Sequence, residues 1–306
     1  MKRNLAMLIG LALIWGASFL FIKVAVRELT PATLILGRLG LAAVTLALLI
    51  PFAVGTGETW RQLREHWGWL VVVALVNTAI PFWLLSWGET RIDSGLASII
   101  QAAVPIFNAA IAFVAFHEVR VTGARLLGVA VGFVGVALLV GAQPQGKVLG
   151  ALAVVGMAFC YGLGGLLTGR YLKPVQPVVV ALASTAIAAA VALPAGVAQG
   201  PSEMPGWKTI ASVVALGIPG TALAYLLFFA LISGPGAAYA SLVTYLIPPI
   251  ALAYGAVFLG ERFGAAALGG LALILAGVAL GTGAARVRRA PSAARNPGAR
   301  HPARTP

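Results

Sequence analysis

A stripe of polar residues runs along an apolar segment between positions 94 and 118. Ser94, Ser98, Gln101, Pro105 and Asn108 follow one another at steps of four, three, four and three. That spacing puts them on one face of a helix with a period of about 3.6 residues. In a membrane span such a stripe should face protein or water and not lipid. Its hydroxyl and amide groups suit hydrogen bonding to a small polar solute.

The stripe occurs a second time, 143 positions later. Ser241, Thr244 and Pro248 take the places of Ser98, Gln101 and Pro105, and Glu261 takes the place of Glu118. A proline inside a helix removes one N–H donor, frees the carbonyl one turn earlier and kinks the helix. We therefore predict hinges at Pro105 and Pro248. The alternative is a tolerated kink, because proline is common in membrane helices.

Other uncharged polar and aromatic residues fall at a similar depth. Asn77 lies about nine residues into its apolar run, roughly 14 Å deep at about 1.5 Å per residue. The alternative for such groups is interhelical hydrogen bonding, which contributes about 0.6 kcal/mol and at most about 2. For the aromatic residues the alternative is a lipid-facing position or core packing. We predict a substrate-binding cavity formed by Asn77, Gln101, Asn108, Ser241, Thr244, Tyr245, Trp15, Tyr161 and Tyr225.

Three charged residues are candidates for a gate or for structural pairing. Arg38 lies about six residues into the second apolar run, where a charge is costly unless it is paired or reaches the surface. It could hold a substrate carboxylate, close an outer gate or pair with a helix C-terminus. Glu118 and Glu261 end equivalent segments, and each could bind the N–H groups at the start of the next helix.

Enzyme chemistry finds no support in the sequence. A magnesium-dependent membrane enzyme needs clustered carboxylates, whereas the chain has one aspartate, Asp93, and seven glutamates that fall nearly all at the ends of apolar runs. The three histidines are scattered. We therefore expect no catalytic residue, no metal and no cofactor. Because no carboxylate is expected near mid-depth, the sequence favours facilitated export, or coupling through the charge of the substrate, over proton-driven transport.

Composition indicates a polytopic, all-α membrane protein. Hydrophobic residues make up 60% of the chain, charged residues 9%, and the mean hydropathy is +0.97; soluble proteins have about 25% charged residues. A single cysteine, Cys160, excludes an intramolecular disulfide framework. The net charge of +13 does not indicate nucleic-acid binding, because the basic residues gather at the ends of apolar runs and in the C-terminal tail.

Ten apolar runs are long enough to cross a hydrocarbon layer of about 30 Å. The first is too long for the core of a cleavable signal peptide, which has about 7 to 15 residues, so we expect it to be retained as a span. The runs are 5–26, 32–52, 68–88, 94–116, 123–141, 148–168, 177–198, 209–231, 236–259 and 264–283.

The distribution of lysine and arginine predicts orientation in the cell membrane. With both termini in the cytoplasm, 14 basic residues lie inside and 5 outside, which agrees with the positive-inside rule. We divide the chain into repeat units 1–142 and 147–284 and a disordered basic tail, 285–306. Each unit holds five spans, an odd number, so the second must be inverted relative to the first, with substrate bound near mid-depth between them.

The motifs resemble the EamA-type branch of the drug/metabolite transporter superfamily. The resemblance covers residues 5–283 and rests on Trp15-Gly16-Ala17-Ser18-Phe19, on Arg38, and on the duplicated proline and glutamate. It implies a fold of five plus five inverted helices that works by alternating access, often exporting amino acids or other small metabolites. The chain departs from symmetry at Ser184, where Arg38 would recur, so any role of Arg38 is asymmetric.

Several alternatives stay open from the sequence. The substrate could belong to another class, such as a drug, a sugar or a nucleotide-linked solute, and a membrane enzyme or scaffold is a weaker alternative. Import and export are not distinguished. The expected partners are a small-molecule substrate and the lipid bilayer. A homodimer is also possible, because Gly128, Gly132 and Gly135 fit either close helix packing or a dimer face.

Overall fold

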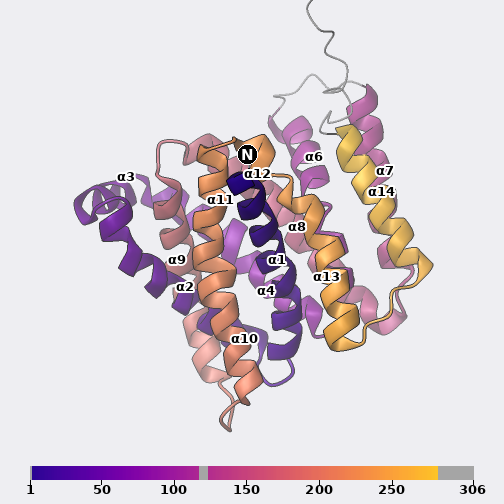
Figure 1. The fold of residues 1–306 in the computed structure, drawn as a ribbon, viewed down its shortest axis with the longest axis horizontal. Coiled ribbons are helices and arrows are strands. Elements are labelled where there is room, and N and C mark those ends of the chain that lie inside the picture. Colours follow the sequence, from indigo (N-terminus) through magenta and orange to yellow (C-terminus); the bar gives the residue numbers. More distant parts are fainter. Residues whose placement is uncertain (1, 117–122, 282–306) are drawn as a thin grey trace, which may run out of the picture.

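A computed structural model describes residues 2–116 and 123–281, and these form an all-helical bundle (Figure 1). Glu118 and the predicted tail, 285–306, lie outside the described residues. The start of α2 shows how local sequence sets an element, because Thr30 caps the helix by accepting from the Thr33 N–H and Pro31 occupies its first turn. The uninterrupted helices are α1 (Lys2–Ala25), α2 (Pro31–Ala53), α7 (Gly123–Gly141), α8 (Gln145–Tyr171), α9 (Pro177–Ala198) and α14 (Ala265–Gly281).

The other predicted segments are helical but interrupted. Two contain a π-helical stretch, with i to i+5 hydrogen bonds, and two contain a turn; the sequence predicted kinks only. One segment with a π-helical stretch consists of α3 (Thr56–Ala74), η1 (Leu75–Ala79) and α4 (Ile80–Glu89). The other consists of α10 (Trp207–Gly217), η2 (Ile218–Leu223) and α11 (Ala224–Ser233). The two segments with a turn are α5 (Ser94–Gln101) followed by α6 (Val104–Phe116), and α12 (Ala237–Ala240) followed by α13 (Val243–Leu259).

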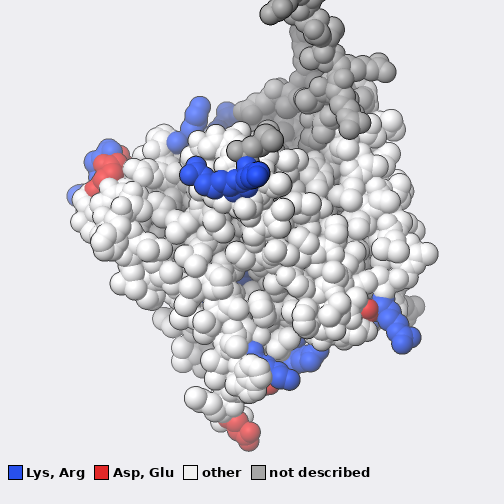
Figure 2. Space-filling view, in the orientation of Figure 1, with Lys and Arg blue, Asp and Glu red and all other residues white. Residues whose placement is uncertain are grey.

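Length and composition make the chain a multi-pass membrane protein. Within the described residues, seven helical segments are long and apolar enough to cross a membrane, and three further apolar helices are shorter, at 126–141, 243–259 and 265–280. Figure 2 shows lysine, arginine, aspartate and glutamate side chains at the two ends of the molecule, with a broad uncharged band between them. Such a band is what a hydrocarbon layer requires.

Helices far apart in the sequence pack side by side. The most extensive contacts join α7 with α14, α2 with α9, α1 with α13, and α4 with α8. In Figure 1 the pair α7 and α14 stands at one edge of the bundle, and the N-terminus lies at the same end of the molecule as the end of α14. The main core lies between α1, α5 and α8, with Leu11, Ile22, Ile99 and Met157 fully buried. Each of these pairs therefore joins a helix from the first half of the chain to one from the second half.

Small residues let α7 and α14 approach closely. A Cβ atom on Gly277 would lie 2.6 Å from both the carbonyl oxygen of Gly128 and the nitrogen of Gly132, and one on Gly135 would lie 3.0 Å from the carbonyl oxygen of Gly270. Such backbone contact is typical of helix pairs in membranes. The glycines that suggested a dimer face are therefore used within the chain.

This packing predicts opposite effects for two glycine substitutions on α14. Gly277→Ala should lower the thermal unfolding temperature in detergent and cost about 1 to 3 kcal/mol, because the new methyl group has no space. Gly269→Ala is the matched control: its Cβ would meet only a Leu138 side-chain carbon at 3.9 Å, so better helix propensity should leave stability unchanged or higher. Equal stability of the two variants would contradict the close contact.

Candidate functional site

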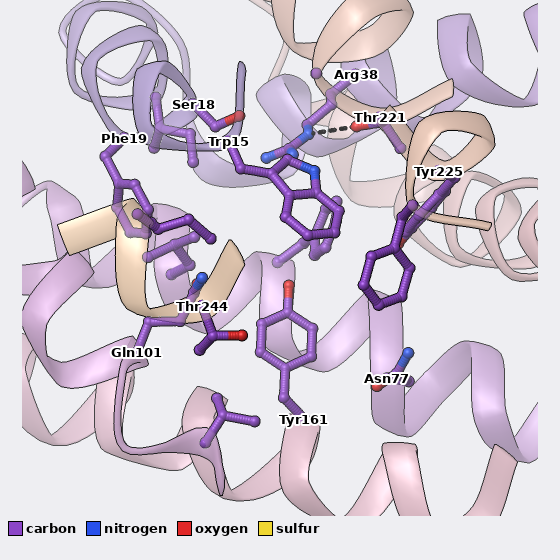
Figure 3. Close-up of a pocket in the computed structure, with 17 residues that line it drawn as sticks. Trp15, Ser18, Phe19, Arg38, Asn77, Gln101, Tyr161, Thr221, Tyr225 and Thr244 are labelled. Atoms are coloured by element: carbon purple, nitrogen blue, oxygen red, sulfur yellow. Dashed lines mark hydrogen bonds between the residues drawn. The ribbon is translucent and has the colours of Figure 1, made fainter. Parts of the chain in front are cut away.

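A cavity of about 290 Å³ lies at the centre of the bundle (Figure 3). Its wall is mostly apolar, with a few polar groups directed inward, which is the usual composition of a small-molecule site. The lining residues come from α1, α2, η1, α4, α5, α6, α8, η2, α11 and α13. They are Trp15, Ser18, Phe19, Ile22, Arg38, Asn77, Phe82, Leu85, Gln101, Val104, Tyr161, Gly220, Thr221, Tyr225, Phe228, Thr244 and Ile247.

Three of the predicted polar residues share a position relative to proline. Asn77, Gln101 and Thr244 line the cavity, and each precedes a proline by four residues: Pro81, Pro105 and Pro248. Because proline has no N–H, the backbone carbonyls of these three residues lose their usual helical donor. Each position thus brings a polar side chain and a freed carbonyl to the same level of the bundle.

The two π-helical stretches hold matching positions. η1 starts at Leu75 and η2 at Ile218, again 143 residues apart; Pro219 lies within η2, and Pro81 follows the end of η1 by two residues. A π-helical turn adds a residue to the helix and commonly marks a functional site. Here η1 carries Asn77, while Gly164 on α8 leaves it space, since a Cβ there would lie 2.6 Å from the Asn77 side chain. Sequence reasoning missed these stretches.

Residues at equivalent positions of the two halves line the cavity together. Trp15 and Tyr161, 146 positions apart, lie on opposing helices, and the Tyr161 hydroxyl points toward Trp15 (Figure 3). The wall is therefore shared about equally by the two halves of the chain. Five further pairs are separated by 143 positions: Asn77 with Gly220, Phe82 with Tyr225, Leu85 with Phe228, Gln101 with Thr244, and Val104 with Ile247.

Arg38 is the charged member of the wall. It is 7% exposed, its Nε atom donates to Thr221 Oγ1 at 3.0 Å, and its guanidinium lies 4.3 Å from the ring centre of Phe82. Thr221 is fixed in turn by donating to the Leu216 carbonyl at 2.8 Å. Within the described residues no carboxylate lies within ion-pair distance of the Arg38 guanidinium. A permanent cation is thus held at the cavity by neutral groups.

The remaining predicted site residues lie away from the cavity wall. The Asn108 amide donates to the Gly162 carbonyl at 3.1 Å, which is the interhelical alternative. Ser241 occupies the turn between α12 and α13, and Tyr245 packs against the main core. At Pro105 the helix is broken by a turn at Ala102–Ala103, instead of the expected kink, whereas Pro248 is inside α13.

Glu261 joins two helices at one end of the molecule. Gly260, with φ +68°, ends α13 in the left-handed conformation that commonly terminates helices, and the N–H groups of Gly260 and Glu261 both donate to the Gly255 carbonyl. The Glu261 carboxylate then accepts from the N–H groups of Ser94 and Gly95 at 2.7 and 3.0 Å. It therefore caps α5 in the other half of the chain, instead of the helix that follows it.

A second cavity of about 390 Å³ adjoins the central one and extends toward the opposite end of the molecule. It shares Trp15, Asn77, Tyr225 and Phe228 with the central cavity and reaches Lys173, in the turn after α8. Its wall contains Ser184, the residue at the position equivalent to Arg38. The second cavity thus adjoins the centre and extends toward the α8–α9 end, whereas Glu261 holds the start of α5 at the other end.

The geometry predicts which positions water reaches. In a Cys160→Ser background, single cysteines at Asn77, Gln101 and Thr244 should react with a water-soluble thiol reagent, because all three line the cavity. Leu138→Cys is the control, since Leu138 is 42% exposed on the apolar outer face of α7 and should react slowly in a lipid bilayer. Protection of all three central positions, with normal labelling after unfolding, would show that the cavity is closed to water.

Comparison with known proteins gives a consistent result. The sequence matches the EamA-like transporter family twice, over residues 3–141 and 148–282. A protein named as a probable terminal-alkyne amino-acid exporter from Streptantibioticus cattleyicolor is 30% identical over 87% of this chain and 89% of its own length. A protein named as a probable amino-acid metabolite efflux pump from Salmonella typhimurium is 26% identical over 90% of this chain and 93% of its own.

One solved crystal structure has a similar fold. It aligns with a TM-score of 0.65 and 19% identity, covering 95% of this chain and 100% of that chain. The family matches together span nearly the whole sequence, as the resemblance in its motifs predicted. The chain belongs to the EamA-like transporter family and is a multi-pass membrane transporter.

Proposed function

We propose that this protein exports amino acids, or similar small polar metabolites, by alternating access. The observation that carries the proposal is Arg38, a buried guanidinium without an acidic partner in the described structure, on the wall of an otherwise neutral and aromatic cavity. A cation held in this way is matched by a ligand carboxylate, because arginine binds carboxylates through two parallel N–H donors.

The rest of the cavity suits the other groups of an amino acid. Trp15, Tyr161 and Tyr225 present aromatic rings around the centre (Figure 3), and ring faces attract an ammonium group. The Gln101 amide and the Thr244 hydroxyl lie across the cavity from Tyr225 and add hydrogen-bonding groups. A zwitterion held between one cation and several neutral groups can bind weakly enough to be released. The names of the two relatives, an amino-acid exporter and an amino-acid metabolite efflux pump, point to the same substrate class.

We further propose ten membrane spans arranged as two inverted repeats, with units 1–142 and 147–284 followed by the basic tail, 285–306. Two separate family matches support this division, as do the residue pairs that line the cavity at a constant offset. The three shorter apolar helices would supply the spans beyond the seven long ones, and a short helix can be accommodated by local thinning of the bilayer.

We propose that the protein lies in the cell membrane with both termini in the cytoplasm. Because the central cavity continues toward Lys173, at an end assigned to the cytoplasm, the structure would then represent the cytoplasm-facing conformation. In this proposal the protein has no enzymatic activity and no nucleic-acid partner. A homodimer remains a further prediction and would need a surface other than the α7–α14 contact.

Substitution of Arg38 tests recognition of a carboxylate. In proteoliposomes loaded with a panel of radiolabelled L-amino acids, Arg38→Gln should raise the half-saturating concentration about 10- to 100-fold, because hydrogen bonds to charged groups contribute about 1.5 to 3 kcal/mol. Leu138→Ala, on the apolar outer face, is the control and should transport like the wild type.

Competition by amino-acid amides separates a binding role from a structural one. An amide lacks the carboxylate, so it should compete poorly with the wild type, and its disadvantage should largely disappear in Arg38→Gln. If the variant lost activity while preserving the full preference for acid over amide, Arg38 would not bind the carboxylate. If no member of the panel were transported by the wild type, the proposed substrate class would be wrong.

The orientation makes a separate prediction. A reporter that works only in the cytoplasm should be active when fused after Pro306, and one that works only in the periplasm should be inactive there. The reason is that the excess of basic residues lies on the side assigned to both termini. Removal of residues after Arg289 should leave transport unchanged, since the predicted tail contributes no span. A periplasmic signal from the reporter would overturn the orientation without affecting the cavity.

A further inference from the structure

Glu89 lies beyond the central cavity, at the end of the molecule where Glu261 holds the start of α5. It is the last residue of α4. Phe82, Leu85 and Glu89 follow one another at steps of three and four residues, so they share a helix face, and Phe82 and Leu85 line the cavity. On α1, Ile22 lines the cavity and Lys23 follows it. Glu89 is therefore about one helical turn, roughly 5 Å, beyond the cavity wall. Sequence reasoning placed it at a membrane edge and gave it no role.

The Glu89 side chain is fully buried and has no hydrogen-bond partner within the described residues. Its exposure is 0%, and neither carboxyl oxygen has a donor there. The hydroxyl of Ser94, at the start of α5, is likewise buried and unpartnered in that part of the chain. An ionised carboxylate without a donor in such a place is very costly, whereas the neutral acid costs far less. The geometry therefore fits a carboxyl group that carries a proton in this conformation.

The charged groups that act on Glu89 come from several elements. Lys23 of α1, Arg38 of α2 and Glu261 after α13 are close enough for electrostatic interaction. Of these, the Glu261 carboxylate accepts from the N–H groups of α5, and Arg38 lies in the cavity wall with its Nε atom bonded to Thr221. The other elements packed against α4 are α8, η1 and α5. They contribute the uncharged groups of Tyr161, Asn77 and Ser94. One further cation can form an ion pair with the Glu89 carboxylate if Glu89 ionises.

That cation is Lys23, and its present contacts are to the backbone. Its Nζ atom donates to the carbonyl oxygens of Glu89 and Ile92 at 2.7 and 2.6 Å. A cation at the C-terminus of α4 is favourable, and the sequence analysis had not anticipated this contact. Within the described residues the Lys23 ammonium makes no ion pair with the Glu89 carboxyl group. The two are held close together without being paired.

We propose that Glu89 is a proton-binding site whose protonation is linked to which end of the cavity is open. This inference rests on the proposed alternating-access function. With the α4–α5 end closed, as here, the carboxyl keeps its proton. When that end opens, water reaches the group, the O–H bond breaks, the proton passes to water as hydronium, and the carboxylate remains beside the Lys23 ammonium. Closure requires the reverse step.

The linkage has a definite sign. Because the conformation closed at the α4–α5 end binds the proton, acidic solution should favour it, and neutral solution should favour opening. A membrane-impermeant thiol reagent applied from the α4–α5 side can report this opening at Leu85→Cys, in a Cys160→Ser background. We expect labelling at about pH 8 to exceed labelling at about pH 5 by roughly fivefold or more, after correction for the pH dependence of a free thiol.

Glu89→Gln is the decisive variant, since glutamine has the shape of the neutral acid but cannot lose a proton. It should make the corrected labelling at position 85 independent of pH and hold it at the low, acidic level. Glu28→Gln is the matched control: Glu28 lies at the same end, where its carboxylate accepts from the Gly206 N–H at 2.7 Å in an exposed contact. The control should keep the pH dependence of the parent.

Further outcomes decide the inference. Labelling of Glu89→Gln that still follows pH would overturn it. Because Glu89 is neutral in the closed conformation that acidic solution favours, Glu89→Gln should fold and should have the melting temperature of the wild type at about pH 5, and failure to fold would also contradict the proposal. Absence of amino-acid transport by the wild type would count against the proposed substrate class, yet the labelling experiment needs no substrate and would still judge Glu89.

Discussion

Backbone groups inside a membrane must find partners within the protein or in water, and this constraint governs where the helices of this transporter can be interrupted. The π-helical stretches η1 and η2, the turn between α5 and α6 and the turn between α12 and α13 all interrupt otherwise long apolar segments. Asn77, Gly220, Gln101 and Thr244, which lie in or beside them, all line the central cavity. The irregular backbone is thus concentrated where a solute or water can satisfy it.

The same constraint explains why the peripheral helices are regular. The helices α7 and α14 are uninterrupted, so their backbone carbonyl groups are hydrogen-bonded within the helices. They pack against each other through glycines, and their outer faces carry large apolar side chains. The helices α2 and α9 form the other long uninterrupted pair. The four interrupted segments all contribute to the central cavity, together with the uninterrupted helices α1, α2 and α8.

Sequence reasoning located the helices and part of the cavity wall. The ten predicted ranges are helical within the described residues, and Asn77, Gln101 and Thr244 line the cavity because each is a polar residue one turn before a proline. Asn108 shared the stripe of Gln101, but a helical stripe continues only while the helix does. The turn at Ala102–Ala103 resets the phase, so Asn108 meets Gly162 of α8 instead.

Other features depend on contacts that no local pattern contains. The Asn77 side chain in η1 packs closely against Gly164, which belongs to another helix. Glu89 follows an apolar run and therefore resembles an exposed end. Its burial depends on α1, which brings Lys23, and on the segment after α13, which brings Glu261 to the start of α5. Such burial emerges only from the packing of distant segments.

A symmetric scaffold alone would make a poor site for a zwitterion, because its two charged ends need different surroundings. Most of the wall consists of equivalent pairs, such as Trp15 with Tyr161 and Phe82 with Tyr225, which keep the same chemical character. The two halves diverge where Arg38 corresponds to Ser184, which lines the adjoining cavity. A second guanidinium there would repel the ammonium end of the substrate and the first guanidinium alike. The loss of that one charge is what gives the proposed site a direction, with the carboxylate toward Arg38 and the ammonium toward the aromatic rings.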